Sequence, residues 1–166
     1  MKNRKWWVLL VLILISLGAL YLLNSSSTFH EKICEDISAK GVTCTEVLFI
    51  DNNNNLMFFK DNQNLRYAKI DDDLNIVEVE AGRIILNEFP YDNIPLSWVS
   101  SGNTLLWGLA SEDVHSILIT GDNDIQPNMF KFDRILLWYQ VFEDGVKFPV
   151  LINAYDKEHV LIFGKE

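Results

Sequence analysis

The sequence predicts a mainly β protein, in which an N-terminal transmembrane helix and a short amphipathic helix precede an antiparallel β-sandwich or meander. Three observations lead to this fold class. An uncharged apolar run spans residues 6–23, apolar side chains recur at helical spacing in 29–40, and from residue 43 short aromatic and branched runs alternate with Asn- and Asp-rich turns. Such periodicity is the main sequence signal for secondary structure.

The first element is the uncharged run, WWVLLVLILISLGALYLL, which is 18 residues long. At about 1.5 Å of rise per residue, a helix of this length nearly crosses a hydrocarbon core of roughly 30 Å. Aromatic residues stand near both of its ends, and three basic residues precede it. The positive-inside rule then places residues 1–5 in the cytoplasm and 29–166 on the outer side of the cell membrane. Residues 24–28 are the linker between the span and the exported domain.

A cleaved signal peptide is the alternative for this segment. Such a peptide has a basic start, an apolar stretch of about 7–15 residues and an A-x-A-like site. The run in this chain is longer, and the small-residue site Ser25-x-Ser27 is weak. An uncleaved anchor is the preferred interpretation, and both interpretations export the domain that follows.

The charge is divided in the same way. Residues 1–24 carry three basic and no acidic residues, whereas 25–166 carry 11 basic and 23 acidic residues, a net charge of −12. An apolar content of 49% excludes a disordered chain. The acidic body speaks against nucleic acid as a partner and would be repelled by anionic lipids and wall polymers. This favours a protein partner.

The second element is the amphipathic helix over 29–40. Thr28 followed by Glu31 three residues later is a capping-box signature, and Ile33 and Ile37 fall on one helical face. Gly41 is placed to end the helix with a positive φ angle.

The remaining elements are predicted strands. Asn and Asp between them favour turns, since both tolerate left-handed backbone and bond to their own main chain. The segment 89–101 contains two prolines and is typical of a connection. Many short strands without a second long helix favour one sandwich or partly closed barrel, with halves at 29–95 and 96–166 as an option. The predicted strands are 43–50, 56–60, 65–70, 75–80, 83–88, 104–108, 116–120, 135–142, 150–154 and 159–163.

The second half also carries a weak resemblance. The segments WGLASEDV at 107–114, SILI at 116–119, WYQVF at 138–142 and PVLINAYD at 149–156 follow one another. This order resembles that of small, single-pass, membrane-anchored extracytoplasmic proteins of Gram-positive bacteria. The resemblance implies a location and a β-sandwich layer, and it carries over no functional residue.

Cys34 and Cys44 are the only cysteines of the chain. Two exported cysteines usually pair, so the sequence predicts a disulfide between them. Two buried thiols are the alternative. A redox or metal role is disfavoured because the C-x-x-C spacing and a third ligand are absent.

The acidic turns raise the question of calcium. Loops that begin at Asp51, Asp71 or Asp122 fail the EF-hand pattern, which needs Gly at the sixth and Glu at the twelfth position. No metal site is therefore predicted, although an irregular calcium site at 71–73 or 122–124 stays open beside ordinary solvated turns. No other cofactor is expected.

Catalytic motifs are missing as well, since the sequence contains neither G-x-S-x-G nor H-E-x-x-H. No catalytic residue is predicted. Trp98, in the expected connection, and Tyr91 are the binding candidates, because exposed aromatic residues mark contact sites. We expect a membrane-tethered extracytoplasmic interaction module whose partner is another membrane or envelope protein. The alternatives are a small cell-envelope hydrolase that uses paired carboxylates and a purely structural anchor.

Overall fold

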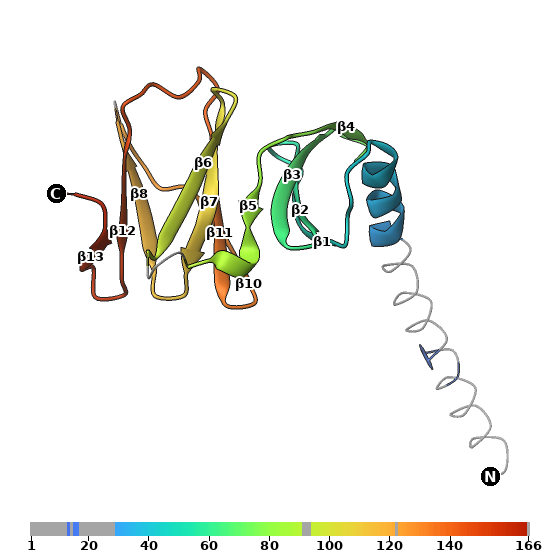
Figure 1. The fold of residues 1–166 in the computed structure, drawn as a ribbon, viewed down its shortest axis with the longest axis horizontal. Coiled ribbons are helices and arrows are strands. Elements are labelled where there is room, and N and C mark those ends of the chain that lie inside the picture. Colours follow the sequence, from blue (N-terminus) through green and yellow to red (C-terminus); the bar gives the residue numbers. More distant parts are fainter. Residues whose placement is uncertain (1–12, 14, 17–28, 91–93, 122, 166) are drawn as a thin grey trace, which may run out of the picture.

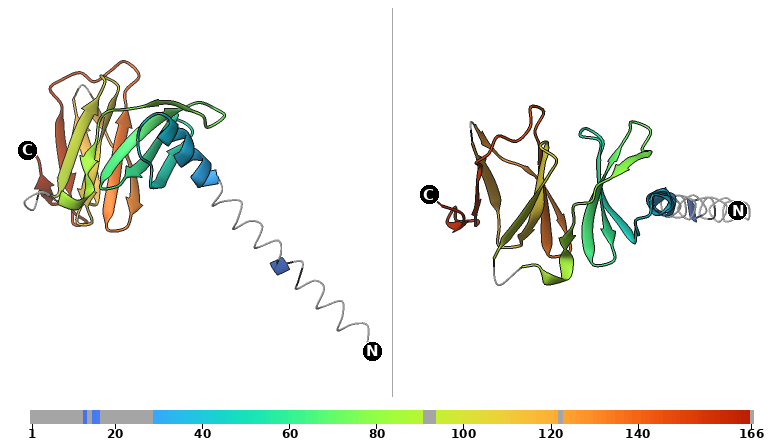
Figure 2. Two further views of the ribbon diagram at one scale, coloured as in Figure 1. Left: turned by 45° about the vertical axis from the view of Figure 1, so that its right-hand side comes forward. Right: turned by 45° about the horizontal axis from the view of Figure 1, so that its top comes forward.

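The computed structural model describes residues 13, 15, 16, 29–90, 94–121 and 123–165. Within them the chain is mainly β, with thirteen strands in three antiparallel sheets and one short helix at 29–39. The helix and the sheets lie side by side along the long axis of the molecule (Figures 1 and 2). The layers follow the order helix, sheet A (β1 to β5), sheet B (β6, β7, β10 and β11) and sheet C (β8, β9, β12 and β13). The predicted mainly β fold class is thus confirmed.

The predicted membrane span at 6–23 lies outside the described residues, apart from three helical positions. Within the described part of the chain, no helix is both long and apolar enough to cross a membrane.

The helix at 29–39 agrees with the predicted range. Its apolar face, Ile33 and Ile37, is buried against sheet A. Gly41 follows with φ +84°, as the sequence predicted. The predicted disulfide is confirmed, and it joins Cys34 of this helix to Cys44 just before the first strand.

Sheet A is a meander that follows chain order, β1-β2-β3-β4, with the short β5 paired to the other end of β3. A 3-10 helix, η1, follows at Leu86–Glu88, so the strand predicted at 83–88 is much shorter than expected. The strands are β1 Glu46–Asp51, β2 Leu56–Asp61, β3 Asn64–Ile70, β4 Ile76–Val79 and β5 Ile84–Ile85.

Sheets B and C are each built from two hairpins that meet through their inner strands. Sheet B has the order β10-β11-β7-β6, and sheet C has the order β13-β12-β8-β9. Successive hairpins alternate between the two sheets, so the chain crosses the sandwich three times. The strands are β6 Leu96–Ser101, β7 Leu105–Ser111, β8 Ser116–Thr120, β9 Asp124–Ile125, β10 Asn128–Phe132, β11 Ile135–Val141, β12 Leu151–Tyr155 and β13 Leu161–Phe163.

The stacking of layers explains why β7 is buried at six consecutive positions. Successive strand residues point to opposite faces. Leu105, Trp107 and Leu109 face sheet A, whereas Leu106 and Ala110 face sheet C. Sheet B is therefore covered on both faces, and its inner strands β7 and β11 are nearly continuous apolar runs.

Two further expectations about elements are wrong. The segment 89–101 is not a connection throughout, because its second half forms β6. The strands β9 and β10 occupy a stretch in which the sequence indicated no strand.

The predicted boundary between 29–95 and 96–166 falls between sheets A and B, which share one core. The division into halves stays a prediction.

Candidate functional site

Trp98 lies on β6 and not in a loop. β6 pairs with β7 in unbroken register, and on its other side no described strand pairs with it. The Trp98 side chain is 41% exposed, while Leu96 on the same face is buried. We call the unpaired side of Leu96–Ser101 the β6 edge. Tyr91, the second binding candidate, lies outside the described residues.

Gly108 of β7 explains how β6 is held. Its position is opposite Trp98 on one side and Trp138 of β11 on the other. A Cβ atom at Gly108 would overlap the carbonyl group of Ser97. The indole Nε1 of Trp138 donates a hydrogen bond of 3.2 Å to that same carbonyl oxygen. The buried Trp138 therefore anchors β6 through its main chain and leaves the Trp98 side chain outside.

The other sheet edges carry features that oppose pairing with a further strand. β1 has a bulge between Val47 and Phe49, and β10 carries the charged Lys131. β4 has four residues and an irregular register, and β5, β9 and β13 have two or three. Bulges, charges, prolines and shortness are the usual protection of an edge. Among the described strands, β6 is an edge of six residues with none of them.

Two buried hydroxyl groups join sheets A and B. The Tyr139 hydroxyl group donates to Asp51 Oδ2 at 2.6 Å, and the Tyr67 hydroxyl group donates to Ser101 Oγ at 2.6 Å. Burial and the bond to Asp51 raise the pKa of Tyr139. Burial alone would raise the pKa of Asp51, but hydrogen bonds from Tyr139, Asn54 and Asn53 outweigh it and lower that pKa. Asp51 is thus a structural carboxylate.

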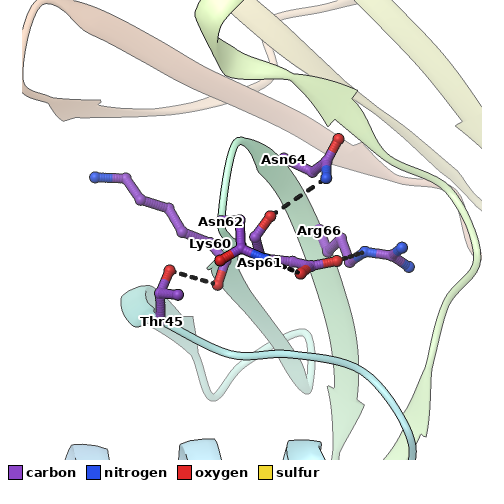
Figure 3. Close-up of polar contacts among 6 residues, drawn as sticks. All are labelled: Thr45, Lys60, Asp61, Asn62, Asn64 and Arg66. Carbon is purple, nitrogen blue, oxygen red and sulfur yellow. Dashed lines mark hydrogen bonds and ion pairs between the residues drawn. The ribbon is translucent and has the colours of Figure 1, made fainter.

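Three other aspartates of the turns form local contacts too. Asp71 accepts hydrogen bonds from the main-chain N–H groups of Asp73 and Asn75, and Asp156 accepts the equivalent pair from its own turn. At the β2–β3 turn, Asp61 accepts a bond of 2.8 Å from Arg66 Nε (Figure 3). Among the described residues, no group of three or more His, Cys, Asp or Glu side chains is placed to hold a metal ion. Part of the second candidate calcium turn, Asp122, is outside those residues.

One hollow gathers acidic side chains. It lies between the β7–β8 and β12–β13 turns and is lined by Glu112, Asp113, Asp156 and Glu158, with His115 beside them. Asp156 is engaged in its turn, and Glu158 pairs with the neighbouring lysine at 3.5 Å. Glu112, Asp113 and Glu158 are exposed. A glycosidase needs an acid that is shielded from water, which these positions do not provide.

Sequence reasoning missed a pocket of about 300 Å³ at one end of the interface between sheets A and B. We call it the junction pocket. Its polar side chains include Tyr67, Lys69, Glu80 and Ser101. The alternation of β3 could have indicated that Tyr67 and Lys69 share a face. Nothing in the sequence indicated that Ser101 lies opposite them.

No protein-family model, curated protein or solved structure matches this chain.

Proposed function

We propose that this protein is a recognition module that binds an extended segment of a partner protein along the β6 edge. The observation that carries the proposal is the unprotected edge beside an exposed tryptophan. An incoming strand would complete the unpaired main-chain groups of β6, which is the physics of β-strand addition. Trp98 would supply the aromatic anchor, since Trp is enriched among residues that dominate binding energy.

The proposed setting is the outer side of the cell membrane, with residues 6–23 as the tether and residues 1–5 inside. Two features support it: the uncharged run itself and the charge contrast between 1–24 and 25–166. A reporter enzyme that is active only outside the cell, fused after residue 166, tests this topology. Activity is expected, and a silent fusion that is expressed at a normal level contradicts it.

The binding proposal is tested by site-specific photo-crosslinking in intact cells. A photoreactive residue replaces Trp98, and a matched control replaces Val160, which is 56% exposed in the β12–β13 turn. We expect one discrete protein adduct from position 98 and none from position 160. Equal labelling at both positions would show random collision.

The captured partner is then purified, and its affinity is measured for Trp98→Ala and Val160→Ala. Loss of a tryptophan anchor is expected to weaken binding by about 2 kcal/mol or more, roughly 30-fold, while the control changes little. An unchanged affinity of the Trp98→Ala protein rules out the β6 edge as the binding surface.

The second candidate function is the envelope hydrolase that uses two carboxylates, and among the described residues it would draw on the acidic hollow, whose exposed acids do not favour it. Glu112 and Glu158 would be its acids, because Asp156 is held by its turn. Purified protein should then release soluble fragments from cell-wall material, and Glu112→Gln should abolish the release. Wall material left intact by the native protein excludes this candidate.

A further inference from the structure

We propose that the junction pocket binds a small ligand with an apolar body and a cationic amino group. This site lies between sheets A and B and shares only Ser101, the last residue of β6, with that strand, so it goes beyond the proposed function. Its volume of about 300 Å³ is at the lower end of the range for ligand sites, roughly 300–1,000 Å³. The ligand is therefore small.

The wall of the pocket provides the apolar contact. Leu56 of β2, Leu105 of β7 and Val141 of β11 line it, and Leu56 and Leu105 belong to the core between sheets A and B. Ligand pockets combine such walls with a few convergent polar groups. The polar groups here come from β3, from β6 and from the segment after β4.

Glu80 gives the pocket its charge preference. Lys69 Nζ contacts Glu78 Oε2 at 2.9 Å and Glu80 Oε1 at 3.0 Å, so two carboxylates surround one ammonium group. Hydrogen bonds from Lys69 to Glu78 and then to Glu80 raise the pKa of Lys69, so it stays charged and paired. One negative charge remains uncompensated. Lys69 and Glu80 both line the pocket and Glu78 does not, so the second contact of Lys69, to Glu78, leaves part of the Glu80 charge for a ligand.

The hydroxyl groups beside Glu80 complete the recognition site. Burial raises the pKa of Tyr67 to about 12, so its hydroxyl group stays protonated and donates to Ser101 Oγ. A serine oxygen has two lone pairs, and the second can accept a further donor. A ligand ammonium group could thus donate to the Glu80 carboxylate and to Ser101 Oγ. Because Tyr67 stays protonated, it offers no phenolate that could take a proton from Ser101, which favours binding over nucleophilic catalysis.

The test uses three water-soluble probes with the same body: 2-phenylethylamine, 2-phenylethanol and phenylacetate. Each is titrated into the full 166-residue chain with labelled Leu and Val methyl groups, and binding is followed by NMR. We expect the amine to shift the methyl signals of Leu105 and Val141. The alcohol and the carboxylate should bind at least about tenfold more weakly, because a hydrogen bond between charged groups is stronger than one between neutral groups. Signals of Val114, in the core between sheets B and C, should stay unchanged.

A matched pair of variants locates the charge that is recognised. Glu80→Gln and Glu78→Gln remove the same charge from the same Lys69 contact, but only the first changes the pocket lining. Glu80→Gln is expected to weaken amine binding about tenfold and Glu78→Gln less than about twofold. Equal effects of the two variants on amine binding overturn the proposal. Equal affinities of the three probes for the native chain overturn it too, and this second comparison does not depend on the folding of a variant.

Discussion

The hydrogen bond between Tyr139 and Asp51 offers the sharpest test of how sheets A and B are held together. Its length of 2.6 Å is typical of a hydroxyl group that donates to a carboxylate. Asp51 is only 9% exposed. Tyr139→Phe removes this single oxygen and leaves the packing of the ring unchanged, so it isolates the bond.

The expected cost follows from the partners that remain. A hydrogen bond to a charged group contributes about 1.5–3 kcal/mol. Asp51 keeps the main-chain N–H groups of Asn53 and Asn54 and the Asn54 side chain at 2.6 Å, so no unpaired charge is created. We therefore expect Tyr139→Phe to lower the free energy of unfolding by about 1.5–3 kcal/mol, or the melting temperature by roughly 5–9 °C.

The pH dependence gives a second reading of the same bond. The pKa of Asp51 is lowered by folding, so its contribution is fully present above the unfolded pKa of about 4 and is lost as the pH falls through the folded pKa. The difference between the native protein and Tyr139→Phe should be constant near neutral pH and should shrink in acid.

The assay is urea unfolding at about pH 7 and at about pH 3. Tyr155→Phe is the control, because the structure gives the Tyr155 hydroxyl group no hydrogen-bond partner among the described residues, and it should leave stability unchanged. The reasoning is refuted if Tyr139→Phe is as stable as the native protein near neutral pH, or if the difference is as large in acid.

Three further predictions concern single positions of the fold. Gly108→Ala should destabilise the protein by about 1–3 kcal/mol in thermal unfolding, because the added carbon would overlap the main chain of β6. Reducing the disulfide between Cys34 and Cys44, which are 10 residues apart, should cost about 2–3 kcal/mol in urea unfolding. Asp71→Ala should lower the melting temperature more than Asp73→Ala, since the Asp71 carboxylate bonds to the main-chain N–H groups that close its turn.

Each of these three predictions has its own control. An added carbon at Gly121 meets only Val150 at 3.9 Å, so Gly121→Ala should be tolerated, and equal damage at the two glycines would contradict the account of β6. The reductant should not change a Cys34→Ser, Cys44→Ser double variant. Asp71→Ala and Asp73→Ala proteins with the same melting temperature would show that the turn does not depend on the Asp71 carboxylate.

Local chemistry made much of the fold predictable. β8 has the predicted bounds, 116–120, because a dense apolar run stands between two turn signals. Asn55 and Asn62 adopt positive φ angles, as the Asn-rich segments suggested. The disulfide was predictable because the chain has only two cysteines and a predicted export signal.

The missed strands depend on partners that are distant in sequence. β6 has serines at half of its positions and follows a proline, and its strand character comes from full pairing with β7. β10 lies between Pro127 and Asp133, whose φ is +51°, and it becomes a strand by pairing with β11. Sequence periodicity does not show such pairings.

The residues of the β6 edge and of the junction pocket also depend on partners that are distant in sequence. The polar neighbours of Trp98 made it a binding candidate in a connecting loop, whereas the structure places it on an edge strand. Tyr67 and Ser101 are 34 residues apart and meet only because sheets A and B stack. No local pattern could have assembled the junction pocket.

The central claim is that β6 is an edge strand with one unpaired side, to which a strand of a partner protein binds. Amide hydrogen exchange at Leu96–Ser101 tests it most directly. In the free protein, alternate β6 amides should exchange rapidly while the remainder, bonded to β7, are protected. Addition of the partner captured at Trp98 should slow the rapid set. The claim is contradicted if all β6 amides are already protected in the free protein, or if the partner slows exchange elsewhere and leaves β6 unchanged.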